Sequence, residues 1–385
     1  MIRLYSDRSH YAREHRGELS DLLRPYWKDM AFSDAQRRQM YGVGDEDFFL
    51  VDNLSEADLA VLPMTWNFYV QRGELGRAGR FIEAARHARR PILSYVSGDE
   101  GVKVPAEFDD VWVVRASGCR SRKRARQVAQ PVFFEDPLKR YPELGLEWAE
   151  DRGQRTEGGG QRSEDRGQWS VVSSPLVPKV GFCGQASASL VKIGWDLIRG
   201  LAWNAASAAG VRWKEAQPVY PPALLRTRAM ELLEGSPLVE TRFVVRDRYR
   251  GGANDAASRE QTTREFYANI AGTDYTLCVR GGGNFSKRFY ETLATGRIPL
   301  LIDTDCLLPF DREVDWSEYI LVVPQSDLWS LPERVARDFK RYANGEWAER
   351  KHKCRQFWQE HLTFAGFHRR LMELLFKNEC AVASY

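Results

Sequence analysis

The fold class of this chain is decided by residues 274–310, which read DYTLCVRGGGNFSKRFYETLATGRIPLLIDTDCLLPF. The pattern is an apolar strand, a glycine-rich turn, a helix and a second apolar strand. Gly296 follows the last helical residues, where glycine commonly ends a helix. Strand–helix–strand units of this kind build parallel sheets that are covered by helices. The stretch therefore predicts an α/β fold.

The same alternation continues on both sides of this stretch. Strands are expected at 2–6, 48–53, 57–66, 91–96, 111–117, 179–184, 243–247, 273–279, 298–303 and 319–324. Helices are expected at 74–90, 187–206, 264–272 and 285–296. At about 150 residues per domain, 385 residues correspond to two or three domains. We predict an N-terminal α/β domain over 1–146, a second over 176–350, and a helical segment over 351–385 that can pack back on the first.

A polar, low-complexity sequence separates the two predicted domains at residues 147–175. The pentapeptide Glu-Asp-Arg-Gly-Gln occurs there at 150–154 and again at 164–168. A segment of this composition buries too little apolar surface to form a core. We interpret it as a mobile linker or an inserted loop.

The overall composition is that of a globular chain with balanced charge. Hydrophobic residues make up 43% and charged residues 28%, and the formal net charge is +3. No run of eighteen apolar residues is present to span a bilayer. The N-terminal residues contain no apolar stretch of signal-peptide length, so we expect a cytoplasmic protein, with the inner face of the membrane as a second location. The six cysteines form no C-x-x-C pair, which argues against a zinc site or a redox motif.

The glycine-rich turn has the chemistry of an anion-binding site. Its glycines leave room for a close approach to the backbone, and the helix that follows directs unpaired N–H groups toward the turn. Cationic and hydroxyl side chains surround it, so a diphosphate fits. The residues concerned are Arg280, Gly281, Gly282, Gly283, Ser286, Lys287 and Arg288. The spacing matches neither the P-loop nor the dinucleotide fingerprint, and a plain tight turn with a solvated basic helix start is the alternative.

Two acidic motifs near this turn have competing interpretations. Glu291 lies one helical turn after Lys287, where it either forms a surface ion pair or accepts hydrogen bonds from two hydroxyls of a sugar. Asp303-Thr304-Asp305 has the Asp-x-Asp form that holds divalent ions in other proteins. Because nearby cations already neutralise a diphosphate, we favour a turn role and predict no metal site and no cofactor.

Several linked motifs in this region resemble the exostosin glycosyltransferases, family 47. They are Leu277-Cys278-Val279-Arg280-Gly281, Ser286-Lys287-Arg288-Phe289-Tyr290-Glu291, Gly296-Arg297-Ile298-Pro299 and Leu308-Pro309-Phe310-Asp311, with weaker matches at 57–63, 179–184, 315–317 and 322–324. The resemblance implies the GT-B architecture, in which two doubly wound, Rossmann-like domains face a central cleft. It also implies transfer of a sugar, with inversion, from a nucleotide sugar held by the C-terminal domain. By the same resemblance, we expect a UDP-sugar as the donor.

In this scheme the N-terminal domain supplies a general base that takes the proton of the acceptor hydroxyl. The candidates are carboxylates that follow expected strands, in the order Asp99, Glu100 and Asp7. The donor would be held by Arg280, the three glycines, Ser286, Lys287, Arg288 and Glu291.

Two other classes of function remain open. A noncatalytic nucleotide-sugar-binding subunit would keep Arg280 and Glu291 without a competent base. A nucleic-acid-binding protein would use the basic run between Arg115 and Arg126, although the small net charge makes this the less favoured reading. The same run also suits an acidic glycan or a lipid-linked acceptor, and association with a membrane surface stays open.

Overall fold

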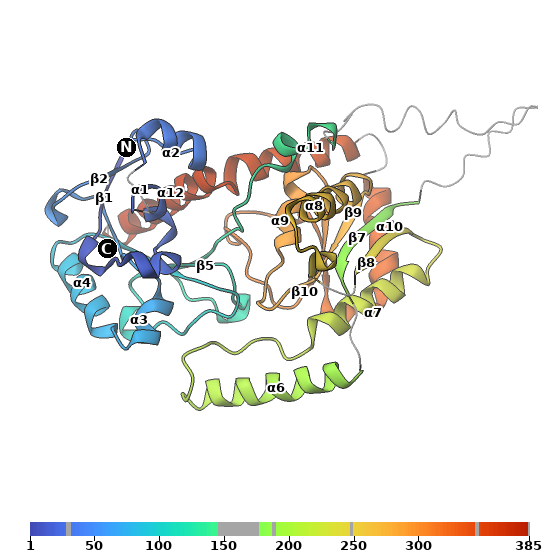
Figure 1. Ribbon diagram of the computed structural model, residues 1–385, viewed down its shortest axis with the longest axis horizontal. Helices are drawn as coiled ribbons and strands as arrows, with labels where there is room; N and C mark the ends of the chain where they lie inside the picture. Colours follow the sequence, from blue (N-terminus) through green and yellow to red (C-terminus); the bar gives the residue numbers. More distant parts are fainter. Residues whose placement is uncertain (28–31, 145–176, 187–189, 247–248, 343–345, 384–385) are drawn as a thin grey trace, which may run out of the picture.

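Two α/β bodies lie side by side in the computed structural model (Figure 1). The structure describes residues 1–27, 32–144, 177–186, 190–246, 249–342 and 346–383. The segment 147–175, interpreted from its sequence as a linker or loop, lies outside the described residues.

The first body is built on a parallel sheet of six strands in the order β2-β1-β3-β4-β5-β6. The strands are β1 Ile2–Tyr5, β2 Phe48–Leu50, β3 Leu59–Val61, β4 Ile92–Val96, β5 Trp112–Arg115 and β6 Gln127–Ala129. The helices of this part are α1 Arg24–Trp27, α2 Asp34–Tyr41, α3 Trp66–Arg72 and α4 Leu75–His87. After β6 the chain forms α5 Pro137–Arg140, whose Arg140 pairs with Glu260 of the second body. The strand order reverses direction between β1 and β3, as in a doubly wound sheet.

The second body contains a parallel sheet of five strands in the order β11-β10-β9-β7-β8. The strands are β7 Lys179–Gln185, β8 Glu240–Arg246, β9 Tyr275–Cys278, β10 Ile298–Asp303 and β11 Leu321–Pro324. The helices are α6 Leu190–Ala208, α7 Pro222–Glu234, α8 Ala256–Ala271, α9 Lys287–Ala294, α10 Leu331–Arg341 and α11 Glu346–His361, and the chain continues into α12 Phe364–Ala383. Its order reverses between β7 and β9. Two doubly wound α/β bodies make up the GT-B architecture, so the predicted fold class is confirmed.

Two predicted elements differ most in length from those observed. The strand expected at 57–66 covers only Leu59–Val61, because Pro63 lacks an N–H donor for the sheet and Trp66 already begins α3. The helix expected at 264–272 begins earlier, at Ala256, where the Asp255 side chain accepts a hydrogen bond from the Ser258 N–H at 2.8 Å. Its first half is polar and exposed, so no apolar periodicity marked it in the sequence.

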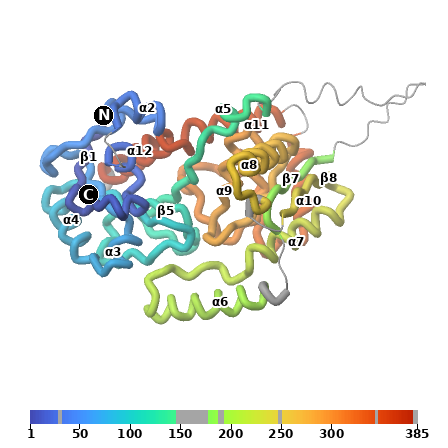
Figure 2. The backbone as a smooth tube through the Cα atoms, in the orientation of Figure 1, coloured from blue at the N-terminus to red at the C-terminus, as the bar shows by residue number. Residues whose placement is uncertain are grey.

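The last helix, α12, returns from the second body to the first (Figure 2). Phe367, Leu371 and Leu375 are fully buried in the hydrophobic core that the first sheet and its helices form. The His368 ring lies 3.0 Å from the Tyr95 hydroxyl of β4. The C-terminal helix is therefore part of the N-terminal core.

The burial of His368 predicts a pH dependence of stability. Burial lowers the pKa of this imidazole to about 4, whereas an unfolded histidine titrates near 6.5. As the pH falls through this window, the unfolded chain binds a proton that the folded chain excludes. The group therefore lowers the free energy of unfolding by about 3 kcal/mol between pH 7 and pH 4. Denaturant titrations across this range should give a shallower pH slope for His368→Gln, and an equal slope in both proteins would contradict the assignment.

Candidate functional site

The carboxyl ends of the two sheets meet each other. The segments that follow β4 and β5 lie against those that follow β9 and β10, and we call residues 97–101, 117–121, 280–284 and 303–306 together the interdomain seam. In open α/β sheets, ligands bind outside the carboxyl ends of the strands, where the strand order reverses. The interdomain seam and the reversal point between β7 and β9 are therefore the candidate positions for a ligand-binding site.

Asn284 forms hydrogen bonds with loops of both bodies. Its side chain is 1% exposed, and its backbone N–H donates to the Ser117 hydroxyl at 2.9 Å. The side-chain amide donates to the carbonyls of Gly118 and Asp305 at 3.1 and 2.9 Å, and accepts from the Thr304 hydroxyl at 2.7 Å. One buried amide therefore joins loops from both domains, so its loss leaves several buried groups without partners.

The glycines of the turn allow this close contact. A Cβ atom on Gly283 would lie 2.0 Å from the Asp99 carbonyl oxygen and 2.9 Å from the Ser117 hydroxyl. A Cβ atom on Gly282 would lie 3.3 Å from the Asp99 carboxylate, while the space beside Gly281 is open. The partner that approaches two of these glycines is thus the N-terminal domain. The contact places Asp99, the first candidate base, beside the glycine turn.

Three arginines converge at the reversal point of the second sheet. Arg288 donates to the Cys183 carbonyl at the end of β7, at 2.8 Å, and Arg280 donates to the Pro218 carbonyl at 2.8 Å. Arg226 of α7 donates to the Gln185 carbonyl at the end of β7 and to the Arg280 carbonyl at 3.3 Å. Within the described part of the chain, none of the three forms an ion pair with a carboxylate, and each has a buried Nε atom without a hydrogen-bond partner.

The electrostatics of this arginine cluster favour an added anion. Burial, together with the positive charges of Arg288 and Arg280, lowers the pKa of Arg226 to about 10. Burial also lowers the pKa values of Arg280 and Arg288. Buried like charges without a counterion are unfavourable, and a phosphate group would relieve both the repulsion and the unpaired N–H groups.

The position of the Arg288 guanidinium is set by the residues that pack around it. Its guanidinium lies 4.3 Å from the centroid of the Phe182 ring, as expected for a cation–π contact. A Cβ atom on Gly184 would lie 2.7 Å from Arg288 Nη2, so a larger residue there would displace the guanidinium.

The other predicted donor residues lie on α9. Lys287 forms an ion pair with Glu291 at 2.9 Å, and the Tyr267 hydroxyl donates to the same carboxylate oxygen at 3.4 Å. Glu291 is 7% exposed and is therefore not a surface residue. Ser286 occupies the N-cap position of α9, where its side chain makes no capping hydrogen bond. The ammonium group of Lys287 is thus engaged by Glu291.

The structure separates the three candidate bases. Asp99 is exposed beside the glycine turn. Glu100 forms an ion pair with Lys214 at 2.6 Å. Asp7 accepts a hydrogen bond from the Ser9 N–H at 2.9 Å; although burial acts to raise its pKa, the Ser9 hydrogen bonds and neighbouring positive charges lower it. A base needs a carboxylate that is free to accept a proton, which favours Asp99.

The Asp-x-Asp motif also belongs to the seam. Asp303 accepts from Arg120 at 2.9 Å and from the Cys306 N–H at 2.8 Å. Asp305, at φ +67°, accepts from the backbone N–H and hydroxyl of Ser121 at 3.0 and 2.5 Å. Both carboxylates thus bind groups of the N-terminal domain. Among the residues that the structure describes, no three His, Cys, Asp or Glu side chains gather in a metal-binding group.

Most of the basic run between Arg115 and Arg126 is engaged in ion pairs. Arg115 is 3% exposed and binds both carboxylate oxygens of Glu215, at 2.7 and 2.5 Å. Further pairs are Arg120 with Asp303, Lys123 with Asp311, Arg124 with Asp109 and Arg126 with Glu379. These basic residues therefore form ion pairs within the chain and do not present one open basic face.

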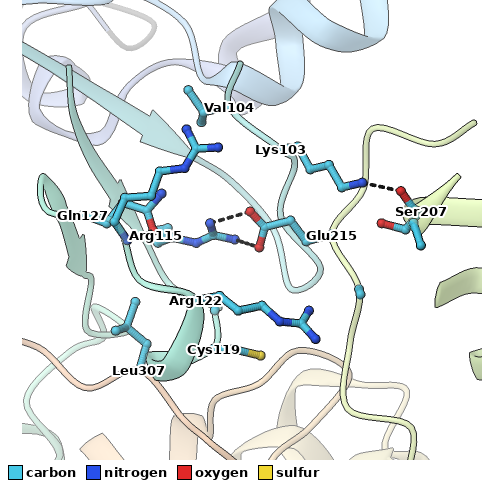
Figure 3. A pocket seen from close by; sticks show the side chains of 13 residues that line it. Lys103, Val104, Arg115, Cys119, Arg122, Gln127, Ser207, Glu215 and Leu307 are labelled. Atoms are coloured by element: carbon cyan, nitrogen blue, oxygen red, sulfur yellow. Dashed lines mark hydrogen bonds and ion pairs between the residues drawn. The ribbon is translucent and has the colours of Figure 1, made fainter. Parts of the chain in front are cut away.

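A cavity of about 420 Å³ lies beside the seam (Figure 3). The Arg115–Glu215 ion pair lies between side chains of both domains in this view, and Arg122 and Cys119 border the same space. The lining residues are Lys103, Val104, Arg115, Gly118, Cys119, Arg122, Arg124, Gln127, Ser207, Ala208, Glu215, Ala216 and Leu307. Its position between the domains makes it a candidate binding site.

Comparison with known proteins shows which family the second body resembles. Residues 240–337 match the model of the exostosin GT47 domain, and this range contains the glycine turn, Arg280 and Arg288. This segment is similar to the exostosin GT47 domain. The resemblance inferred from the sequence motifs is confirmed. The Exostosin-1 homolog of Caenorhabditis elegans is 34% identical over 77 residues, and the chain spans about a fifth (20%) of that relative's length.

Two solved structures align with most of the chain at low identity. A glycosyltransferase from Rickettsia africae ESF-5 is 10% identical with a TM-score of 0.38, and the alignment covers 98% of each chain. Anabaena Alr3699/HepE in complex with UDP-glucose is 11% identical with a TM-score of 0.34, over 98% of this chain and 100% of that one. The fold class of this chain is assigned from its own two strand orders.

Two residues of the site were not predicted from the sequence. Arg226 lies outside the glycine-rich stretch, and its local sequence does not distinguish it from Arg228, which is 57% exposed on the same helix. Asn284 directly follows the three glycines. A polar side chain at that position, before the apolar Phe285, was the one feature of the sequence that could have indicated its role.

Asn284 gives a direct test of the seam. Replacement by alanine removes the amide that joins the Gly118, Thr304 and Asp305 groups, so Asn284→Ala should lower the free energy of unfolding by about 2 to 4 kcal/mol. The matched control is Asn53→Ala, at an exposed position, which should change it by less than about 0.5 kcal/mol. Equal values for the two variants in denaturant titrations would show that Asn284 does not join the domains.

Proposed function

We propose that the protein is an inverting glycosyltransferase that moves a sugar from a nucleotide sugar, UDP-linked, to a hydroxyl group of a glycan or lipid-linked acceptor. The observation that carries this proposal is the cluster of Arg226, Arg280 and Arg288 at the reversal point of the second sheet, without a carboxylate partner among the described residues. The exostosin GT47 match over the same domain supports sugar transfer as the reaction.

The arginine cluster suits the leaving group of such a reaction. When the bond between the sugar carbon and the diphosphate breaks, negative charge develops on the diphosphate oxygens. Fixed guanidinium groups in a buried site stabilise that charge without reorganisation. We infer that the protein needs neither a divalent metal ion nor another cofactor for this step.

Asp99 is our preferred general base. The acceptor oxygen attacks the anomeric carbon from the face opposite the diphosphate, and its proton passes to a carboxylate of the N-terminal domain. Asp99 is exposed and lies beside Gly282 of the donor domain, while Glu100 and Asp7 are engaged by other groups. A noncatalytic nucleotide-sugar-binding subunit is the alternative, and it predicts no transfer by the wild-type protein, whereas an enzyme whose base is Asp99 loses its transfer in Asp99→Asn. The variant should keep UDP binding and lose transfer if Asp99 is the base.

Binding of UDP tests the arginine cluster. Loss of one charge-assisted hydrogen bond costs about 1.5 to 3 kcal/mol, so Arg226→Gln and Arg288→Gln should each weaken UDP binding by about 10- to 100-fold. Arg228→Gln is the matched control, because Arg228 lies on the same helix as Arg226 and its side chain is exposed. Calorimetric titrations would be run with excess EDTA and with magnesium.

The proposed site predicts the outcome of these titrations for the wild-type protein and for the control variant. UDP should bind the wild-type protein and Arg228→Gln equally, with and without EDTA. Unchanged affinity in both cluster variants would place the nucleotide elsewhere, and binding that requires magnesium would direct attention to Asp303 and Asp305.

We further propose that α6 rests on an anionic membrane surface. Trp195, Ile198 and Leu201 point outward with exposed fractions of 68, 61 and 57%, and Figure 1 shows α6 at the lower edge of the molecule. The sequence from 190 to 214 contains Lys192, Arg199, Arg212 and Lys214 against the single acid Asp196. Arg199 pairs with Asp196 and Lys214 with Glu100, so the four cations exceed these two acids by two charges. An apolar helix face with tryptophan and an excess of cations is typical of helices that lie in the headgroup region. No helix in the described ranges meets the length and hydropathy needed to cross a bilayer.

Vesicle binding tests the role of α6. The protein should sediment with phosphatidylglycerol vesicles and much less with phosphatidylcholine vesicles, because both apolar burial and charge contribute. Trp195→Ala with Leu201→Ala should reduce binding at least about tenfold. Trp329→Ala is the matched control, since this tryptophan is 73% exposed on another element. Equal loss in the control, or no binding by the wild type, would contradict the proposal.

A further inference from the structure

Two cysteines face each other across the interdomain seam. Cys119 follows β5 of the first body and Cys306 follows β10 of the second, and together they form an isolated antiparallel bridge. The flanking Arg120 N–H donates to the Asp305 carbonyl at 3.0 Å. Hydrogen bonding by the flanking residues marks the central pair as a non-hydrogen-bonded pair. In such pairs the Cα atoms lie about 4.5 Å apart and both side chains project on the same face.

This backbone geometry suits a disulfide. Disulfides join Cα atoms that are roughly 4.4 to 6.8 Å apart, and the spacing of the bridge falls within that range. Both sulfur atoms also contact the same side chain. Asn284 Nδ2 lies 3.8 Å from Cys119 Sγ, and Cys306 Sγ lies 3.4 Å from Asn284 Oδ1. The two thiols therefore converge on one amide between the domains.

A small molecule can approach the cysteine pair from the side of Cys119. Cys306 is 2% exposed, whereas Cys119 is partly exposed and lines the 420 Å³ cavity beside the seam. Burial raises the pKa values of both thiols, so their thiolate forms become more populated as the solution is made alkaline. An oxidant that enters the cavity thus reaches Cys119 first.

We propose that Cys119 and Cys306 are a covalent modification site, at which a small disulfide oxidises the pair to an interdomain disulfide. The Cys119 thiolate attacks one sulfur of the small disulfide and releases the first small thiol. The Cys306 thiolate then attacks Cys119 Sγ in the mixed disulfide and releases the second. Two protein thiols and one small disulfide give one protein disulfide and two small thiols, so electrons and protons balance. The product joins the loop that carries Ser117 to the loop that carries Thr304 and Asp305, whatever reaction the protein performs.

The test is oxidation of the full chain with oxidised glutathione at pH 8.5. Thiol titration should show the loss of two thiols, and mass spectrometry of a non-reduced digest should find the peptide of Cys119 joined to that of Cys306. The melting temperature should rise by several degrees, because the bond closes a long loop, and a reducing agent should reverse the change. The cross-linked peptide should be absent from Cys119→Ser and present in Cys380→Ser, the control at the exposed cysteine of α12.

Two results would overturn the assignment. One is glutathione retained on Cys119 as a mixed disulfide without the cross-link, which would mean that Cys306 cannot reach it. The other is a loss of two thiols in Cys119→Ser equal to that in the wild type, which would place the disulfide elsewhere. Because Cys119 is only partly buried, its serine variant should fold, and its melting temperature without oxidant provides that check.

Discussion

The contact between the carboxyl ends of two parallel sheets organises this molecule, and the buried amide of Asn284 lies at its centre. Each sheet directs its loops toward the other, and Asn284 binds groups from both sets of loops. The three glycines before it have no side chains, which lets Asp99 and Ser117 approach the turn. The placement of Asp99 relative to Arg280 and Arg288 depends on this one contact.

The second constraint is electrostatic. Arg226, Arg280 and Arg288 lie at the point where the strand order of the second sheet reverses, and backbone carbonyls are their hydrogen-bond partners. Carbonyls satisfy part of each guanidinium but do not neutralise its charge. In and beside the interdomain seam, Arg115 is paired with Glu215 and Arg120 with Asp303. The arginine cluster differs from these pairs, because its three guanidinium groups have no carboxylate partner among the described residues.

The sequence predicts the architecture well because the signals are local. The alternation of apolar strands and helices, and the glycine that follows α9, depend on neighbouring residues only, and Gly296 has the expected positive φ of 61°. Arg280 and Arg288 were predicted for the same reason, since they flank the glycine turn.

Contacts between distant segments could not be predicted in this way. Arg226 joins the cluster only because α7 packs beside the ends of β7 and β9, and nothing in its own helix indicates that. The basic run from 115 to 126 resembles an open charged face until its partners, such as Asp303, Asp311 and Glu379, come from other parts of the chain. The glycines were expected to make room for a ligand, whereas two of them make room for Asp99.

The central claim is that the arginine cluster at the β7–β9 reversal point holds the diphosphate of a nucleotide sugar. A crystal structure of the protein with UDP tests it most directly. The claim predicts diphosphate oxygens within hydrogen-bond distance of the guanidinium groups of Arg226, Arg280 and Arg288, with the uridine in the second body. A diphosphate bound elsewhere, with the three guanidiniums still facing only backbone carbonyls, would contradict it.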